Sequence, residues 1–395
     1  SGDTAGSGDA AGAGDAAGAG DTAGSGDAAG AGETLLAGEA LLRRVTFYVV
    51  PRVSPDGAEH VLTTGEYVRS SPLFYPHEEP LEGLHPQDLD GDGIVAQMRI
   101  EDPAGGWRVS SSDSRVMVGR TISDGDGPFY RVYAEGTIHR FDTHVLREAP
   151  RARGLDFNRN FPHAWKPEQE QRGAGRFPLS EPETRGVAEF IHGHPNISFF
   201  LALHTGIEVL VPPEGARAFS DFPQDDRATF HQLAAPAVDL LKMPFESLFS
   251  HDYGAIYGDF GEWLYEHLGL PGFVAELWSP AARAGISLKD QIRAGRGMDS
   301  AEPMDLAIAK WLDEQGIHDH LRHWHRFDHP QLGMIELGGW RQGLFSRAPD
   351  GPILEEIGQR VAAYAKLLAG ALPRVEVRSF DIDPLGPDLY KVGLT

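Results

Sequence analysis

The sequence contains no cysteine, so every chemistry that needs a thiol is excluded. Disulfide bonds, thiolate nucleophiles and cysteine-ligated metal sites cannot form, and any metal ligand must be histidine, aspartate or glutamate. No apolar run approaches the roughly 18 residues that a membrane helix needs. The chain is therefore predicted to have no membrane span.

Positive charge is also scarce, because 35 lysine and arginine residues stand against 58 aspartate and glutamate residues, for a formal net charge of −23. A nucleic-acid-binding protein needs a basic face to neutralise phosphates, so nucleic acid is not an expected partner. With 395 residues, the chain has room for one large domain or two ordinary ones. It opens with Ser1, shows no signal-peptide pattern and has its first methionine at Met98, so we expect a processed, trimmed or partial chain.

Residues 1–33 lack the larger aliphatic side chains and consist of a six-residue repeat, G-[DE]-[TA]-A-G-[SA]. A six-residue period can indicate a β-solenoid, but such a coil needs an aliphatic residue in each turn to fill its interior. Glycine, alanine and one negative charge per repeat cannot offset the entropy lost on ordering. We predict a disordered low-complexity tail.

The rest of the chain predicts an α/β domain over residues 34–372, with a mixed, mostly parallel sheet flanked by helices. Apolar runs typical of buried strands occur at 45–50, 197–203 and 273–278. Helical spacing or capping signals mark 34–44, 180–193, 223–243, 258–268 and 352–372. Within the domain, residues 58–150 are expected to be a loop-rich insertion. Residues 373–395 show alternating strand patterns and are expected to start a truncated β-domain.

Two stretches contain potential metal ligands outside the main motifs. Asp88, Asp90 and Asp92 occupy positions 1, 3 and 5 of a loop with glycine at position 6, which is the opening of a calcium loop, although position 12 is Arg99. Calcium binding and a tight Asp-Gly turn both remain open for this loop. Residues 318–329, HDHLRHWHRFDH, are rich in histidine, and we interpret them as a solvated helix and loop.

Two loop stretches contain arginines that are candidate functional residues. The stretch 154–165, GLDFNRNFPHAW, places Asn158 beside Arg159 in a turn. An arginine and an asparagine together form a planar donor set that can grip a carboxylate with two hydrogen bonds, although a surface arginine in such a turn is often only solvated. Arg69 lies shortly before a proline and is predicted to be extended and accessible.

Two candidate catalytic or ligating residues lie at strand positions. His204 closes the apolar run 197–203, where it is either a structural histidine or a ligand or base on a rigid element. Glu276 lies within the apolar strand 273–278. Glutamate is rare in strands and almost never buried without a partner, so we predict a functional carboxylate with a perturbed pKa.

Taken together, these motifs resemble the zinc metallocarboxypeptidases of the carboxypeptidase A type (the M14 peptidases), particularly a bacterial branch with a long insertion. The resemblance covers roughly residues 41–372 and is specific because several motifs occur in the family's order. The matching stretches are PRVSPDG at 51–57, VRSS at 68–71, GLDFNRNFPHAW at 154–165, SEPETRGVAEFI at 180–191, LALHTG at 201–206, EWLYEHLGLPGF at 262–273, VAELW at 274–278 and HPQLGMIELGGW at 329–340.

The resemblance implies a role for each candidate residue. His204 matches a zinc ligand, Glu276 the general base and Arg69 the arginine that polarises the scissile carbonyl. Asn158 and Arg159 match the pair that holds the terminal carboxylate of a peptide or protein substrate. The family's mobile substrate-binding tyrosine falls at Tyr253 or Tyr257. The uncharged Phe260–Gly261 near the expected pocket base favours a neutral side chain at the cleaved residue, and the resemblance favours a secreted or periplasmic location.

One departure from the family pattern affects the zinc site. The family's first two zinc ligands come from an H-x-x-E motif, and no histidine in this chain is followed three residues later by glutamate. Catalytic zinc sites use about three protein ligands. We therefore expect weak or absent zinc binding and impaired hydrolysis. The alternative is a non-catalytic pseudoenzyme that binds C-terminal peptides or cell-wall peptides through Arg159.

Overall fold

The computed structural model describes residues 38–64, 67–76, 82–142, 146–149, 153–251, 253–343, 347–349, 351–373 and 377–394. Its helices are α1 (Gly38–Leu42), α2 (Pro55–Thr64), η1 (Phe157–Arg159), α3 (Pro182–Gly193), η2 (Phe219–Asp221), α4 (Gln224–Ala234), α5 (Ala237–Leu240), η3 (Leu248–His251), α6 (Phe260–Leu268), α7 (Pro280–Arg283), α8 (Leu288–Gly295), α9 (Glu302–Gln315) and α10 (Gly351–Gly370). Its strands are β1 (Gly83–Pro86), β2 (Gln97–Glu101), β3 (Trp107–Val109), β4 (Met117–Gly119), β5 (Tyr130–Ala134), β6 (Gly136–His139), β7 (Phe200–His204), β8 (Glu208–Val211), β9 (Gly272–Leu277), β10 (Leu321–His329), β11 (Gly333–Trp340), β12 (Phe380–Gly386) and β13 (Leu389–Leu394). The disorder predicted for residues 1–33 falls outside the described residues.

A small mixed sheet forms the centre of the α/β body. Its strand order is β7-β9-β8, with β7 and β9 parallel and β8 antiparallel to β9. Helices cover both faces, as the predicted fold requires: α4, α5 and α10 pack against one face, and α3 and α6 against the other. The mixed α/β prediction is confirmed, although parallel pairing between named strands of the described chain is limited to β7 and β9.

Side-chain alternation along β9 separates the two faces. Phe273 and Ala275 are fully buried in the cluster that contains Tyr364 of α10. Val274 points to the other face, where its Cγ2 lies 3.5 Å from an ideal Cβ built on Gly261 of α6. Because the period of a strand is two, Glu276 shares the face of Val274. The apolar pattern of β9 thus turns this glutamate toward α6.

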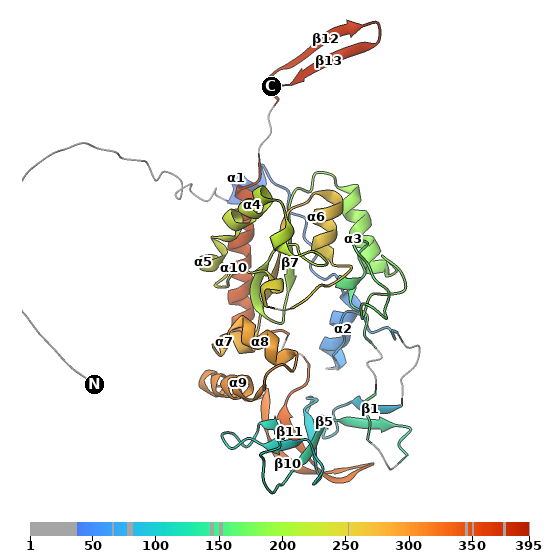
Figure 1. Ribbon diagram of the computed structural model, residues 1–395, viewed down its shortest axis with the longest axis vertical. Coiled ribbons are helices and arrows are strands. Elements are labelled where there is room, and N and C mark those ends of the chain that lie inside the picture. The colour runs from blue at the N-terminus through green and yellow to red at the C-terminus, as the bar shows by residue number, and fades with distance from the viewer. Residues whose placement is uncertain are drawn as a thin grey trace, which may run out of the picture.

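A second, antiparallel sheet forms the lower part of the molecule in Figure 1, with the strand order β10-β11-β2-β5-β3-β4. The segment 58–150, expected to be loop-rich, contributes four of its strands and also the separate pair β1 and β6. Met98 and Leu337 are almost completely buried where β2 meets β11. Short strands separated by glycine- and aspartate-rich turns explain why the sequence pattern hides this sheet.

The histidine-rich stretch 318–329 differs from its prediction. It was expected to be a helix and loop, but Leu321–His329 form strand β10, paired with β11. Its side chains alternate in exposure, with Leu321 in one apolar cluster and Phe327 packed against another. The alternation, which the histidines obscure in the sequence, explains why this stretch is a strand.

The predicted strand at 45–50 is also wrong. These residues form no strand, and their side chains are largely exposed, with Val49 77% exposed. Strand β7 lies at an edge of the central sheet, and its Leu203 is 54% exposed. Among the described residues, neither segment 45–50 nor the outer edge of β7 has a ladder partner, and a strand forms only where such a partner is present.

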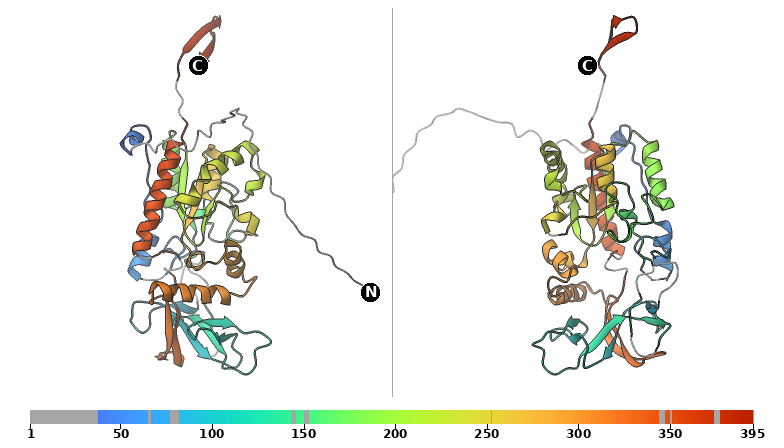
Figure 2. Two further views of the ribbon diagram at one scale, coloured as in Figure 1. Left: turned by 90° about the vertical axis from the view of Figure 1, so that its left-hand side faces the viewer. Right: turned by 45° about the vertical axis from the view of Figure 1, so that its right-hand side comes forward.

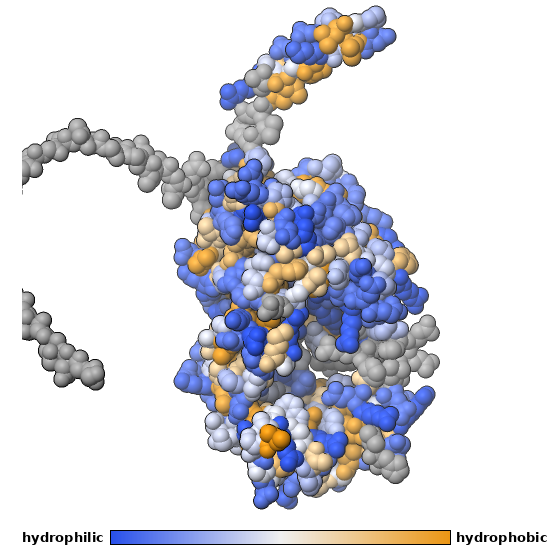
Figure 3. All heavy atoms as spheres, viewed as in Figure 1, coloured by the Kyte–Doolittle hydropathy of each residue, from blue (hydrophilic) through white to orange (hydrophobic). Residues whose placement is uncertain are grey.

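The C-terminal residues 377–394 form the hairpin of β12 and β13, drawn beyond the end of α10 in Figures 1 and 2. Register pairs Phe380 with Leu394 and Ile382 with Val392, so one face of the hairpin is apolar. All four side chains are exposed, and hydrophobic residues are visible on the hairpin in Figure 3. Among the described residues, no helix is both long enough and apolar enough to cross a membrane.

Candidate active site

Strand register brings His204 and Glu276 together at the carboxyl ends of β7 and β9. The two residues are direct partners in the parallel ladder, and Nδ1 of His204 lies 3.8 Å from Oε1 of Glu276. The carboxyl ends of parallel strands are where open α/β sheets place their functional groups. The sheet itself therefore sets the spacing of this pair.

The carboxyl group of Glu276 is largely withdrawn from water. Its Oε2 atom is buried and has no hydrogen-bond partner in the described chain. Burial raises the pKa of Glu276 to about 8, against the opposing influence of Arg69, Arg347 and Arg159. Burial likewise lowers the pKa of His204. Both groups therefore favour their neutral forms near neutral pH.

Arg69 is tied to the loop that contains Arg159. Its Nε donates to Oδ2 of Asp156 at 2.9 Å. Oδ1 of the same aspartate accepts a hydrogen bond from the backbone N–H of Asn158 at 3.0 Å, which caps η1. The buried carboxylate of Asp156 therefore holds Arg69 in place. It also caps the turn that carries Arg159.

The side-chain amide of Asn158 forms hydrogen bonds within the protein. Its Nδ2 donates to Oδ2 of Asp259 at 2.6 Å, and its Oδ1 accepts from the backbone N–H of Phe260 at 2.9 Å. Asp259 is the N-cap of α6 and also accepts from the backbone N–H of Glu262. Asn158 therefore anchors the start of α6, a role that sequence reasoning missed.

Arg159 keeps most of its donors available. Its Nη1 donates to the backbone carbonyl of Asn158 at 2.7 Å, and no carboxylate in the described chain pairs with it. A guanidinium has five N–H donors, so several remain to bind an anion in two-pronged fashion. Of the predicted Asn158–Arg159 pair, Arg159 is the member placed to hold a carboxylate.

A cleft of about 1700 Å³ collects most of the predicted site residues. It is lined by Arg69, Asn158, Arg159, His204, Tyr253 and Glu276. Tyr257 is not part of this lining, and its ring lies 5.7 Å from Nζ of Lys166. Of the two tyrosines that the sequence left open, Tyr253 is the one that reaches the cleft. Arg296 lies over its ring at 5.2 Å.

The described residues do not form a zinc site around His204. It is the only histidine that lines the cleft in the described chain, and no third metal-ligating atom joins it and Glu276. The nearby carboxylates of Asp156 and Asp259 are engaged by Arg69 and Asn158. Because catalytic zinc needs about three protein ligands, the residues present do not fit the metal.

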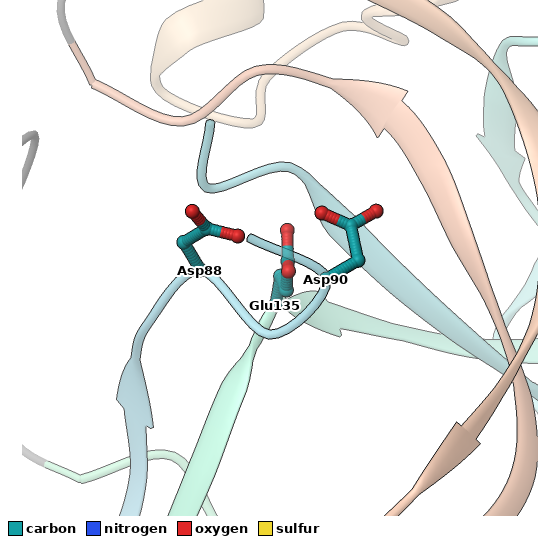
Figure 4. A group of neighbouring side chains, drawn as sticks. All are labelled: Asp88, Asp90 and Glu135. Atoms are coloured by element: carbon teal, nitrogen blue, oxygen red, sulfur yellow. The ribbon is translucent and has the colours of Figure 1, made fainter. Parts of the chain in front are cut away.

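A separate acidic group lies at the end of the second sheet, where Figure 4 shows Asp88, Asp90 and Glu135 around one turn. Their oxygen atoms lie within 4.8 Å of one another, so the group could hold a metal ion. However, both Asp88 oxygens accept backbone N–H groups of the turn, and both Glu135 oxygens accept backbone N–H groups beside it. The third predicted calcium ligand, Asp92, pairs with Arg322. These contacts explain the motif as an Asp-Gly turn, and calcium binding is not supported.

Sequence reasoning missed two arginines at the cleft. Arg296 of the turn after α8 and Arg347 of the segment before α10 both line it. Neither belongs to a recognisable motif, and each reaches the cleft only through the tertiary fold. Asp156, in contrast, lies inside the 154–165 motif and was within reach of the sequence argument.

Comparison with known proteins identifies the family. A family described as zinc carboxypeptidase matches residues 35–289. Carboxypeptidase A1 of Rattus norvegicus is 29% identical over 150 residues, which cover 36% of this chain and 34% of that protein. Carboxypeptidase A1 of Mus musculus is 28% identical over 177 residues, which cover 42% and 40%. The chain thus spans well under half the length of these relatives.

A crystal structure of thrombin activatable fibrinolysis inhibitor (TAFI) is also similar, with 23% identity over 43% of this chain and 44% of that chain. Its TM-score is 0.29, so nothing is inferred from that superposition. The family match, in contrast, extends over more than half of the 395 residues and includes Arg69, Arg159, His204 and Glu276. The protein belongs to the zinc carboxypeptidases of the M14 peptidase family.

Proposed function

We propose that this chain recognises peptides by their free C-terminal carboxylate and hydrolyses the C-terminal peptide bond, with activity impaired because the first zinc half-site is missing. The observation that carries the proposal is the convergence of Arg69, Arg159 and Glu276 on one cleft. Peptide or protein C-termini are the substrates of this proposal, and a secreted or periplasmic location is part of it.

Recognition of the terminal carboxylate is assigned to Arg159. The donors of its guanidinium that Asn158 does not use can form a bidentate, charge-assisted pair with a carboxylate. An internal peptide bond offers no such anion, so this contact selects chain ends. The uncharged Phe260, which also lines the cleft, suits a neutral terminal side chain.

Proton transfer is assigned to Glu276. A general base works best when its pKa lies near the working pH, and burial raises the pKa of this carboxyl to about 8. In its ionised form, which grows in population as the pH rises toward 8, it can accept a proton from the attacking water and return it to the leaving amine. Arg69, whose charge acts on Glu276, is assigned to stabilise the oxyanion that develops on the scissile carbonyl.

The missing metal ligands favour one alternative, a pseudoenzyme that binds C-terminal or cell-wall peptides without cleaving them. Carboxylate recognition through Arg159 needs no metal, so binding survives where turnover does not. In both proposals the peptide is held in the same way. They differ only in the fate of the bound peptide.

The test combines zinc content with turnover on the full chain. After dialysis against micromolar zinc, elemental analysis gives the zinc held per chain, and benzoylglycyl-phenylalanine serves as substrate. Under the enzyme proposal, slow turnover is measurable and Glu276→Gln abolishes it, whereas the exposed Glu189→Gln control leaves it unchanged. About one zinc retained per chain would show that a further residue replaces the missing ligands. Absence of zinc and turnover, with peptide binding preserved in Glu276→Gln, rejects the enzyme and supports the pseudoenzyme.

A further inference from the structure

Arg347 is a cleft residue that lies outside the segment matched by the family. Its Nη1 donates to the backbone carbonyl of Thr205 at 3.4 Å. An ideal Cβ built on Gly206 would lie 2.5 Å from the same Nη1 atom. The guanidinium therefore lies directly against the turn that follows His204, although it is 143 positions away from that histidine in numbering.

Arg347 has no carboxylate partner among the described residues. Its side chain is exposed, its recorded hydrogen bond goes to an uncharged carbonyl, and no carboxylate among the described residues forms an ion pair with it. Arg69, in contrast, is paired with Asp156.

Arg159 likewise lines this cleft and has no carboxylate partner in the described chain. The terminal carboxylate of a bound peptide satisfies only one of these two arginines. Arg347, Arg159 and Glu276 all line the same cleft. A peptide held at Arg159 and passing Glu276 therefore has a second cation within reach.

We propose that Arg347 is a specificity-determining residue that selects peptides carrying a second carboxylate, the side chain of an aspartate or glutamate near the C-terminus. The proposal rests on the carboxylate recognition that is assigned to Arg159. A cleft lined by unpaired cations attracts anions, and the low dielectric of its walls strengthens that attraction. A charge-assisted hydrogen bond from Arg347 then discriminates the carboxylate from an amide of the same shape.

Peptide binding to the full chain tests this assignment without any need for turnover. Benzoyl-Gly-Glu-Phe and benzoyl-Gly-Gln-Phe differ only in one charge, and their dissociation constants are measured by calorimetry at low ionic strength. We expect the glutamate peptide to bind about tenfold more tightly, which corresponds to one charge-assisted hydrogen bond of about 1.4 kcal/mol. Added salt should reduce the difference, because the attraction is between exposed charges.

Variants then locate the preference. Arg347→Gln should bind both peptides equally. Arg347→Lys keeps the positive charge but cannot form two parallel hydrogen bonds, so it should retain part of the preference for the glutamate peptide. Arg44→Gln removes another exposed arginine that lines the cleft and serves as the matched control, with the preference intact. Equal binding of the two peptides to the unmodified chain, or a preference that Arg347→Gln leaves intact, would overturn the proposal.

A third peptide separates this proposal from the one on which it rests. Benzoyl-Gly-Glu-Phe amide lacks the terminal carboxylate but keeps the glutamate. If it binds as tightly as the acid, recognition by Arg159 is rejected. If the acid binds more tightly than the amide and the glutamate preference is absent, the Arg347 assignment alone is rejected.

Discussion

The backbone carbonyl of Arg159 packs directly against Gly258. A Cβ built on Gly258 would overlap that carbonyl oxygen, and the φ angle of Gly258 is +72°, a conformation that other residues adopt at a cost. Backbone hydrogen bonds connect the carbonyl of Gly258 with the N–H of Phe161, and the N–H of Gly258 with the carbonyl of His163. The turn that presents Arg159 is therefore held by a neighbour that must be glycine.

Gly258→Ala should lower both the stability of the protein and its affinity for free carboxylates. The added methyl group meets backbone that cannot rotate away, so we expect a loss of about 1–3 kcal/mol in the free energy of unfolding. Urea denaturation and peptide calorimetry check the two effects. Gly285→Ala is the control, because Gly285 has a φ of +83° but no atom within 4 Å of its Cβ position. The Gly285→Ala variant should lose about 1 kcal/mol in the free energy of unfolding through backbone strain, and its peptide affinity should be unchanged.

Arg159→Gln should weaken binding of benzoylglycyl-phenylalanine by about 10- to 100-fold, since hydrogen bonds to charged groups contribute about 1.5–3 kcal/mol. Arg159→Lys should restore only part of the affinity, because an ammonium cannot make the two parallel hydrogen bonds. The C-terminal amide of the peptide is the control ligand and should bind equally weakly to all three proteins. A loss of amide binding equal to the loss of acid binding would show that Arg159 acts on structure and not on the carboxylate.

Stability should depend on pH through Asp305, in the first turn of α9. Burial, reinforced by the neighbouring charge of Glu302, raises the pKa of Asp305 to about 7 from 3.8. Between these two pH values the native state holds a proton that the unfolded state releases, so this group makes stability fall as pH rises from about 4 to about 7. The negative charge at the start of a helix is favourable, but only by about 0.3–1 kcal/mol.

Asp305→Asn should therefore unfold at a higher temperature than the unmodified chain at pH 8, by an amount that corresponds to about 1–3 kcal/mol. At pH 4 the two proteins should differ less, because Asp305 is then protonated in the native state and only partly ionised in the unfolded state. Thermal denaturation across this range checks the expectation. Asp239→Asn, at an exposed position of α5, should leave the pH profile unchanged. A gain for Asp305→Asn that is the same at pH 4 and pH 8 would contradict the assignment.

The outer edge of β7, which has no ladder partner among the described residues, should promote self-association. An unpaired strand edge with an exposed apolar side chain is a template for pairing with another chain, and Leu203 is 54% exposed at this edge. Leu203→Lys should shift sedimentation profiles toward monomer at high protein concentration. Leu354→Lys, at a leucine that is 55% exposed on α10, removes equal apolar surface away from the edge and should have a smaller effect. Equal effects would indicate general solubility instead of edge pairing.

Much of the site could be predicted from the sequence because each motif ends at a strand or turn. The apolar residues before His204 and those on either side of Glu276 predict two strands. Parallel pairing of these strands brings the two residues together. Arg159 ends the short turn Phe157–Arg159, and Asp156 caps the start of that turn. These features depend on short stretches of chain, which periodicity can identify.

Other features depend on partners distant in sequence and could not be predicted in this way. The run 45–50 has strand composition but no ladder neighbour in the described chain, and composition alone does not reveal that absence. The side chain of Asn158 looks free in the sequence and is instead engaged by Asp259, 101 positions away. Arg347 carries no motif, and only the fold brings it to Thr205.

The functional side chains of the cleft lie on two kinds of backbone, paired strands and a segment outside the central sheet. His204 and Glu276 lie on paired strands, whereas Arg347 lies between β11 and α10, in the described residues 347–349, which belong to no strand. A substitution at Arg347 therefore leaves the ladder untouched, while a one-residue slip of β9 would move Glu276 to the other face. Peptide selectivity could therefore be changed by substitution at Arg347, while His204 and Glu276 keep their positions on the paired strands.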